Sequence, residues 1–399
     1  MTTMSGTTVS AALLHTATRR TIIRAVEDLW PDKDIVLGPQ CPSVTSYVCR
    51  VTVDGAELMA KYSWLGMSLV SLLRGAGGTW EEVQETQRAY VRGTDLLTAR
   101  EARHLEALRR LERPRVCETA GLRDGVLLTR MVEGMPLADA VWARPWETGE
   151  LLDATLLTLR DLHGPAGAEC LRGAAPIGER SVAAVFRRKF NGLSANAYLR
   201  ELGRDCGLPE HGRQEVVELL RSAVWRLHRM ADAISFRRNT TVFGDLKPEH
   251  VYIDGPRLRF IDPAVHWAAG PEPDVAKLTG RTVLLAIGNS EWRAARAIVQ
   301  GVASTLARHA AALPARDRAA RVREVMILWL MDIVSILSTC LSAPRGLPLA
   351  PHQQSLVAHA RTVAGIVDRV SALLVGAMTG HRLLDAVFSE VDHAAGGTR

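Results

Sequence analysis

The chain has 399 residues, of which 47% are hydrophobic and 23% are charged. This composition is ordinary for a globular protein, and the length is sufficient for two domains that each have a core. The net charge of +6 is spread thinly, without a block of five or six basic residues, which argues against nucleic-acid binding.

The cysteines and the apolar segments indicate the cellular compartment in which the protein is expected. The six cysteines are scattered and none forms a CxxC pair, which argues against a zinc site or a disulfide framework and favours a reducing environment. The N-terminus lacks a long apolar stretch ahead of its arginines, so we expect no signal peptide. The longest apolar run, Val325–Leu341, is interrupted by Asp332 and is expected to be a buried core helix rather than a membrane span. We therefore expect a cytoplasmic protein that contacts no membrane.

The first third of the chain is predicted to be rich in strands. Its clearest signal is Asp54-Gly55, which lies between two strand-like segments and is typical of a tight hairpin turn. Thr79 and Glu82 have the spacing of a capping box, which begins a helix. The predicted elements of this third are, in chain order, strands within 34–63, a helix from 79, a helix over 95–111, and short strands over 115–118 and 125–132.

After about residue 132 the pattern changes to helices. The predicted helices are 151–162, 214–233, 292–313, 321–341 and 353–374, with one strand-rich interruption at 242–262. A strand-rich first third followed by a helical remainder predicts an α+β chain of two lobes. We divide it into residues 1–132 and residues 133–399.

The strand-rich interruption gathers acidic and histidine side chains. Two short strands joined by the turn Asp254–Arg257 form a predicted hairpin. Folding this hairpin brings His250 beside Asp262, with Asp245 one short loop away. The result is two potential metal ligands and a free carboxylate in one small volume, and gathered carboxylates usually need a cation between them. The alternative is that the two aspartates only cap turns.

This segment resembles the signature of the aminoglycoside-phosphotransferase-like small-molecule kinases, which have a bilobal, protein-kinase-like fold. The signature is a Gly-Asp, an Asn five residues after that Asp, and a strand hairpin that ends in Ile-Asp. The matching positions are Gly244-Asp245, His250 and Ile261-Asp262. The resemblance implies that Asp245 is the catalytic base or hydroxyl-orienting carboxylate and that Asp262 is the main magnesium ligand.

His250 departs from the family, which has Asn at this position. Histidine can bind a metal through nitrogen, but it is less suited to Mg²⁺ than an oxygen donor. We therefore expect Mg²⁺, with Mn²⁺ as the alternative, at Asp262 and His250; otherwise water or Glu249 completes the shell. The sequence Asp-Leu-Lys-Pro-Glu also looks like the catalytic loop of Ser/Thr protein kinases, in which the lysine, here Lys247, steadies the transferred phosphoryl group.

The first lobe then resembles the nucleotide-binding lobe of a kinase. Lys61 ends the second arm of the Asp54-Gly55 hairpin and matches the lysine that holds the α- and β-phosphates; the alternative is an edge-strand lysine. Its partner is expected on the helix 95–111. Glu101 lies on the apolar face of that helix and needs a partner there, whereas Glu106 is flanked by arginines. We therefore choose Glu101.

Two further segments are assigned to the nucleotide, ATP or GTP, by resemblance. The loop that contains Ser43, Thr45 and Ser46 would cover the phosphates with hydroxyls and backbone amides. The segment after residue 127 looks like an interlobe hinge, in which the carbonyl of Arg130 and the amide of Val132 would bind adenine. The alternative for this segment is a strand that ends at a glycine turn.

Four residues near the motif have competing interpretations. Asp274 is interpreted as the N-cap of the next helix. His266 and Trp267 would face the substrate or serve only in packing. Asp332 is expected to be a paired core acid rather than a substrate contact.

The resemblance implies ATP-dependent phosphorylation of a hydroxyl of a small natural product, and we expect this to inactivate an antibiotic in self-resistance. Residues 270–399 contain 14 Arg and Lys against 10 Asp and Glu, which argues against a strongly polycationic acceptor. A capuramycin-type nucleoside phosphotransferase is a candidate relative. The alternatives are a biosynthetic sugar or cyclitol kinase and, with His250 as its support, a nucleotide-binding pseudokinase scaffold. A protein kinase ranks below these because Ile-Asp-Pro replaces Asp-Phe-Gly. The oligomeric state stays open.

Overall fold

The computed structural model describes residues 7–192, 199, 202–234, 237–288 and 291–396. The chain forms two compact units. The first unit consists of Met1–Glu106, Cys117–Val132 and Ser342–Ala350, and the second of Ala107–Val116, Glu133–Leu341 and Pro351–Arg399. A single cut after Val132 therefore does not describe the chain, because one early segment belongs to the second unit and one late segment belongs to the first.

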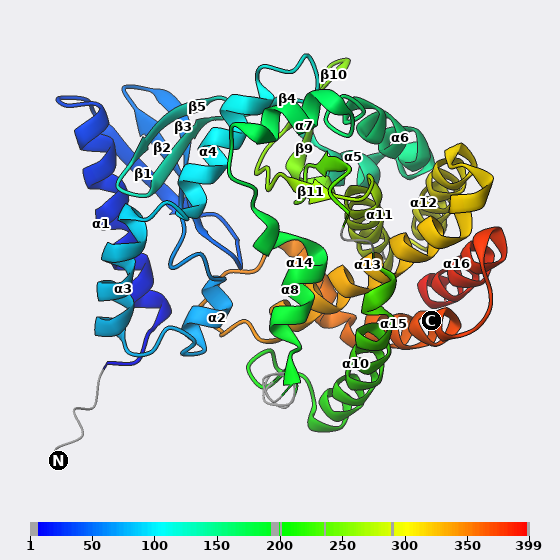
Figure 1. The fold of residues 1–399 in the computed structure, drawn as a ribbon. Coiled ribbons are helices and arrows are strands. Elements are labelled where there is room, and N and C mark those ends of the chain that lie inside the picture. The colour runs from blue at the N-terminus through cyan, green and yellow to red at the C-terminus, as the bar shows by residue number, and fades with distance from the viewer. Residues whose placement is uncertain (1–6, 193–198, 200–201, 235–236, 289–290, 397–399) are drawn as a thin grey trace. The chain divides into compact units, whose positions relative to one another are not determined.

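The core of the first unit is a five-stranded antiparallel sheet (Figure 1). Its order is β1 (Ile35–Gln40), β2 (Tyr47–Val53), β3 (Ala56–Tyr62), β6 (Val126–Arg130) and β5 (Thr119–Arg123). Asp54 and Gly55 have φ values of 47° and 82°, as the predicted tight hairpin between β2 and β3 requires. The sequence did not predict β5, which pairs with β6 around a second Asp-Gly turn.

The described residues of the first unit also form four helices, of which α1 lies against the sheet. They are α1 (Ala11–Leu29), α2 (Leu69–Leu73), α3 (Trp80–Arg92) and α4 (Leu97–Leu108). The predicted capping box at Thr79 and Glu82 is confirmed at the start of α3. α1 was not predicted; it begins at the N-cap Ser10 and contacts both β1 and β5, so it crosses the sheet and buries one apolar stripe against it.

The strands of the second unit form or flank the predicted catalytic segment. One sheet has the order β4 (Arg115–Val116), β10 (Arg257–Phe260), β9 (Val251–Asp254) and β7 (Met135–Pro136), and β8 (Thr240–Val242) pairs with β11 (His266–Ala268). The predicted β9–β10 hairpin is confirmed. Because β8 and β11 pair with each other, both ends of residues 243–265 are fixed side by side.

The rest of the second unit is helical. Its helices are α5 (Leu137–Ala143), η1 (Pro145–Glu147), α6 (Thr148–Thr158), α7 (Pro165–Arg172), η2 (Gly178–Arg180), α8 (Val182–Lys189), α10 (Glu210–Met230), η3 (Ala231–Ala233), η4 (Pro248–His250), α11 (Glu272–Ile287), α12 (Trp292–Ala312), α13 (Ala315–Leu341), α14 (Pro351–Ala358), α15 (Ala360–Val375) and α16 (Gly380–Gly396). The predicted α+β class, with strands concentrated early and helices later, is confirmed.

α13 is the central helix of the second unit. It packs against α8, α10, α11 and α15. In the described part of the chain it is the one helix long and apolar enough to cross a membrane by length and composition, and 89% of its most apolar stretch is buried inside the protein. Such burial is typical of a core helix, as the sequence predicted for residues 325–341.

Candidate functional site

The β9–β10 hairpin brings the predicted site residues together. Ile261 N donates to the carbonyl of His250 (3.0 Å), which closes the open end of the hairpin. His250 Nε2 then lies 3.7 Å from Asp262 Oδ2, and His250 Nδ1 lies 3.6 Å from Asp245 Oδ2. The predicted meeting of these three side chains is confirmed. Asp262 has a φ of 57°, a conformation that is strained for a non-glycine residue and is often found at functional sites.

The tautomer of His250 follows from its neighbours. Nδ1 lies 3.0 Å from the carbonyl oxygen of Asp245, and because a carbonyl only accepts, Nδ1 donates the proton. Nε2 therefore presents its lone pair on the side of Asp262. Burial, reinforced by the charge of Lys247, lowers the pKa of His250 to about 4, so the ring is neutral near pH 7. A neutral imidazole fixed through Nδ1 is the usual state of a metal-binding histidine.

The side chains of this site fit a divalent cation whose remaining ligands are phosphate oxygens and water. The carboxylate of Asp262 and Nε2 of His250 supply one oxygen and one nitrogen, and Mg²⁺ sites commonly combine one or two carboxylates with phosphate oxygens and water. Among the described residues no cluster of three or more His, Cys, Asp and Glu side chains is arranged to hold a metal. Glu249, the alternative ligand, has Oε1 3.3 Å from Nε2 of His352.

Asp245 is not the free carboxylate that the sequence interpretation assumed. Lys277 Nζ lies 2.5 Å from its Oδ1, and Lys247 Nζ lies 3.5 Å from its Oδ2. Burial alone raises the pKa of Asp245, but the positive charges of Lys247 and Lys277 outweigh it and hold the pKa well below its usual range. The cation that the gathered carboxylates require is therefore supplied in part by lysine side chains.

The charged cluster extends into the core through Asp332. Arg281 donates to this carboxylate from Nε (2.5 Å) and Nη2 (3.1 Å), and Lys277 Nζ lies 3.8 Å from Asp332 Oδ1. The prediction that Asp332 is a paired core acid is confirmed. Sequence reasoning missed Lys277, although the basic residues of α11, Lys277 and Arg281, lie one turn apart on a largely buried helix, and that spacing was an available signal.

Asp274 fixes the backbone just before Asp245. The prediction that it caps α11 is wrong, because the helix begins at Glu272 and has Pro271 as its N-cap. Asp274 is instead fully buried, and it accepts hydrogen bonds from the amides of Phe243 (2.7 Å) and Gly244 (2.8 Å). A short acid at this point satisfies two buried donors that no strand pairs.

Gly244 is required by both conformation and space. Its φ is 85°, and a Cβ there would lie 2.2 Å from the carbonyl oxygen of Ala264. The ring of His266 packs on the same side, and its Nδ1 donates to Ala264 O (2.9 Å). His266 is buried, and together with the half-buried Trp267 it lines a cavity of about 290 Å³ within the second unit.

In the first unit, Lys61 and Glu101 form the expected ion pair. Lys61 Nζ lies 2.7 Å from Glu101 Oε2, and Glu101 is 4% exposed. Glu106, one turn further along α4, is exposed. The choice of Glu101 over Glu106 is confirmed as geometry, because the acid on the buried face of α4 is the one that reaches β3. The role of the pair toward a nucleotide stays a prediction.

The two other nucleotide segments have defined positions. The amides of Thr45 and Ser46 both point to Ser43 Oγ at 3.4 Å, and converging amides of this kind also accommodate an anionic oxygen. Arg130 ends β6, and its amide donates to Glu118 O (2.9 Å). Val132 is the last residue of that segment of the first unit. Contacts of these residues with phosphate or adenine stay predictions.

Comparisons with known proteins find distant likeness only to solved structures. No protein-family model matches the sequence, and no curated protein matches it. A thermostable mutant of the aminoglycoside phosphotransferase APH(4)-Ia is 11% identical over 88% of this chain and 99% of its own, with a TM-score of 0.48. An ethanolamine kinase of Plasmodium vivax is 11% identical over 92% and 90%, with a TM-score of 0.43. LicA in complex with AMP is 14% identical over 87% and 98%, with a TM-score of 0.44.

Proposed function

We propose that the chain is an ATP-dependent phosphotransferase that phosphorylates a hydroxyl of a small natural product. The observation that carries this proposal is the cluster at the catalytic segment, where Asp245, Lys247, His250 and Asp262 lie within 3.7 Å of their neighbours in the cluster. A carboxylate, a lysine and a paired acid and imidazole are the groups that phosphoryl transfer needs for the acceptor, the transferred group and a metal.

Asp245 would receive the acceptor. Because Lys277 and Lys247 keep this carboxylate ionised, it accepts a hydrogen bond from the acceptor hydroxyl and aligns its oxygen for attack. The same low pKa makes Asp245 a weak base, and the loose transition state of phosphoryl transfer asks little of a base. Its main contribution is therefore orientation, and it takes the hydroxyl proton late in the reaction. Lys247 steadies the transferred phosphoryl group by charge.

The remaining residues would hold the nucleotide. Lys61, oriented by Glu101 at 2.7 Å, supplies a positive charge for the α- and β-phosphates, and the amides of Thr45 and Ser46 cover the phosphates. Asp262 and His250 would hold a divalent cation, which when bound neutralises charge on the phosphate oxygens. The nucleotide is ATP or GTP, and the metal is Mg²⁺ or Mn²⁺.

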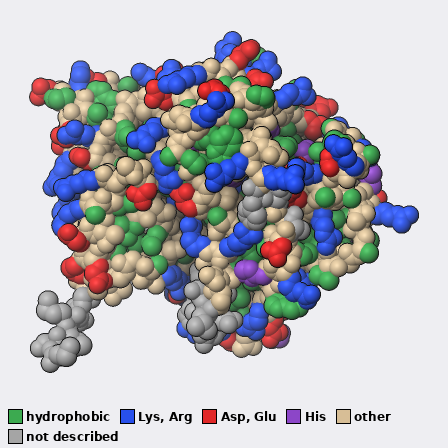
Figure 2. Space-filling view, in the orientation of Figure 1, with side chains coloured by type: hydrophobic (Ala, Val, Ile, Leu, Met, Phe, Trp, Pro, Cys, Tyr) green, Lys and Arg blue, Asp and Glu red, His purple; other side chains and the backbone are tan. Residues whose placement is uncertain are grey.

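The charges around Asp245 favour an acceptor that is not a polycation. Lys277 and Arg281 neutralise Asp245 and Asp332, the two acids that would otherwise attract cationic groups. Figure 2 shows Lys and Arg side chains scattered over the visible face. A neutral or acidic hydroxylated compound, such as a nucleoside antibiotic, is therefore favoured, and inactivation of an antibiotic is the role we propose. A biosynthetic sugar or cyclitol kinase is the second candidate.

A pseudokinase scaffold is the rival from another class. Two observations favour it: the contact of Lys277 with Asp245 at 2.5 Å, and the histidine in place of the family asparagine. Both would reduce catalysis without preventing nucleotide binding.

One experiment separates these functions. The purified protein is incubated with ATP and Mg²⁺ or Mn²⁺, together with a panel of nucleoside antibiotics, aminoglycosides, sugars and cyclitols, and phosphorylated products are detected by mass spectrometry. We expect a phosphate ester of at least one non-polycationic compound. The same incubation is repeated with Asp245→Asn, which should form less product, and with Asp254→Asn, in the turn of the same hairpin, as the matched control. Tight ATP binding without any product over the whole panel would instead favour the scaffold.

A further inference from the structure

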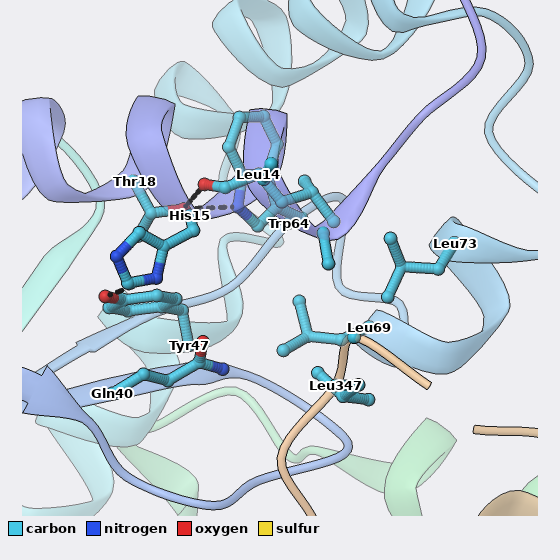
Figure 3. Close-up of a pocket in the computed structure, with 12 residues that line it drawn as sticks. Leu14, His15, Thr18, Gln40, Tyr47, Trp64, Leu69, Leu73 and Leu347 are labelled. Carbon is cyan, nitrogen blue, oxygen red and sulfur yellow. Dashed lines mark hydrogen bonds between the residues drawn. The ribbon is translucent and has the colours of Figure 1, made fainter. Parts of the chain in front are cut away.

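A cavity of about 340 Å³ lies inside the first unit (Figure 3). Its walls come from α1, from the ends of β1 and β2, from Trp64 and α2, and from the returning segment Ser342–Ala350. Four separate stretches of chain therefore line one pocket, which is partly open, and none of the residues in its walls belongs to the site proposed above.

The cavity lies on the face of the sheet opposite to Lys61. Tyr47, which lines the cavity, pairs with Tyr62 across β2 and β3, and Val48 pairs with Lys61. Because successive side chains of a strand point to opposite faces, Tyr47 and Lys61 lie on different sides of the sheet. α1 covers the side of Tyr47, with His15 and Tyr47 in ring contact. A ligand here would not compete directly for Lys61.

The cavity has a polar end and an apolar end. Figure 3 shows His15, Tyr47 and Gln40 gathered on one side, and Leu69, Leu73 and Leu347 on the other. The hydroxyl of Tyr47 lies 3.4 Å from His15 Nδ1, at the long end of the hydrogen-bond range, and it also interacts with Arg19. Trp64 Nε1 already donates to Thr18 Oγ1 at 2.9 Å, so that wall offers its aromatic surface rather than a donor.

We propose that this cavity binds a small aromatic compound with one hydroxyl group. A cavity of about 150 Å³ lined by apolar side chains binds benzene, so a cavity of about 340 Å³ has room for two fused rings. The leucine end takes the hydrocarbon part, and the hydroxyl reaches Tyr47, His15 or Gln40. An apolar pocket with a few polar groups at one end is the usual form of a small-molecule site.

The position of the cavity gives the ligand a regulatory effect, and this part rests on the proposed function. Gln40 ends β1 and Tyr47 begins β2, so the two flank the loop 41–46 that would cover the phosphates. A ligand that holds both residues fixes the ends of that loop, and the affinity for ATP changes with it.

Binding is tested with 2-naphthol by isothermal titration calorimetry. We expect one site in the wild-type protein. Ala11→Phe fills the cavity from the first turn of α1 and should weaken binding by at least about tenfold, equivalent to about 1.4 kcal/mol. Thr16→Phe places the same ring on an exposed position of the same helix and should leave binding unchanged. Absence of binding to the wild-type protein, or equal binding by all three proteins, overturns the site.

Tyr47→Phe gives a second test that does not depend on a filled cavity. It keeps the ring and removes the hydroxyl, so the preference for 2-naphthol over naphthalene should shrink. An unchanged preference would overturn the assignment of the polar end.

The regulatory part is tested separately by the dissociation constant for ATP with and without 2-naphthol. We expect a change of about threefold or more in the wild-type protein and none in Ala11→Phe; an unchanged ATP affinity with 2-naphthol bound overturns the coupling. Because this readout is ATP affinity, it holds whether or not an acceptor is found, so its failure is distinguishable from failure of the proposed transfer reaction.

Discussion

The buried charged side chains of the two units are compensated in different ways. In the first unit Lys61 faces Glu101 at 2.7 Å, and the acid orients one lysine. In the second unit Lys277 lies between two acids, Asp245 and Asp332, and each acid has a further cation nearby. Within the cluster, the loss of one charged group is compensated in part by the charges that remain. The pair therefore holds the ammonium group of Lys61 in place, and the cluster keeps the carboxylate of Asp245 ionised.

The largest effect is expected at the centre of the cluster. Asp245→Asn should lower turnover by about 10²- to 10⁴-fold, because the carboxylate that aligns the acceptor hydroxyl is lost, and should leave ATP affinity close to that of the wild-type protein. Steady-state kinetics and ATP titration check this. Near-full turnover in Asp245→Asn would show that another group orients the acceptor.

Breaking the pair should act on the nucleotide instead. Glu101→Gln leaves Lys61 without the acid that orients it and should raise the KM for ATP by about tenfold, or about 1.4 kcal/mol. Glu106→Gln is the matched control on the same helix and should change KM little, because an exposed acid contributes little. A larger defect in Glu106→Gln than in Glu101→Gln would contradict the assignment of the pair.

Removing the shared cation should move a pH profile rather than abolish activity. Lys277→Met takes away one of the two charges that hold the pKa of Asp245 well below its usual range, so that pKa rises. The acid limb of the kcat profile should therefore move to higher pH, with only a few-fold loss at pH 7. The exposed Lys33→Met is the control. An unmoved acid limb would mean that Lys277 does not set the ionisation of Asp245.

The variant His250→Asn tests whether His250 is a metal ligand or only a packing residue. On the ligand interpretation, nitrogen favours Mn²⁺ over Mg²⁺ more than an oxygen donor does. His250→Asn restores the family residue, so activity should persist while the ratio of Mn²⁺- to Mg²⁺-supported rates falls by a few-fold. Rates measured with each metal check this. An unchanged ratio would place the imidazole outside the metal shell.

The smallest effect is expected at His309, outside both charged sites, on the free energy of unfolding at acid pH. Burial lowers the pKa of His309 to about 4, and its Nε2 is buried without a hydrogen-bond partner. The unfolded chain, with a pKa of about 6.5, binds the proton more readily, so the contribution of His309 to stability is lost as pH falls from about 6.5 toward 4. His309→Leu should reduce this loss in urea unfolding at pH 5, whereas the exposed His381→Leu should not. Equal acid sensitivity of His309→Leu and the wild-type protein would contradict this account.

Local patterns carried most of what the sequence predicted. The Asp54-Gly55 hairpin, the capping box at Thr79 and the β9–β10 hairpin each follow from a few neighbouring residues, and all three are confirmed. The hairpin in turn placed His250 beside Asp262, and the apolar face of α4 singled out Glu101 for Lys61.

The errors came from contacts between residues far apart in the chain. Asp274 has the appearance of a helix cap, but its partners are the amides of Phe243 and Gly244, about thirty residues earlier. Lys277 reaches Asp245 across a similar separation. α1 depends on packing against the sheet, and the segment Ser342–Ala350 contacts Arg74 and Ala11, more than 260 residues earlier; local propensity encodes neither contact.

The central claim is tested most directly by following the γ-phosphate of ATP. The wild-type protein and Asp245→Asn are incubated with ATP labelled with ³²P at the γ position, a divalent metal and the best acceptor from the panel, and the label is separated into acceptor ester and inorganic phosphate. The account predicts that the wild-type protein places the label in the ester, and that Asp245→Asn does so at least about a hundredfold more slowly. Label released only as inorganic phosphate, or an equal rate of ester formation by both proteins, would contradict it.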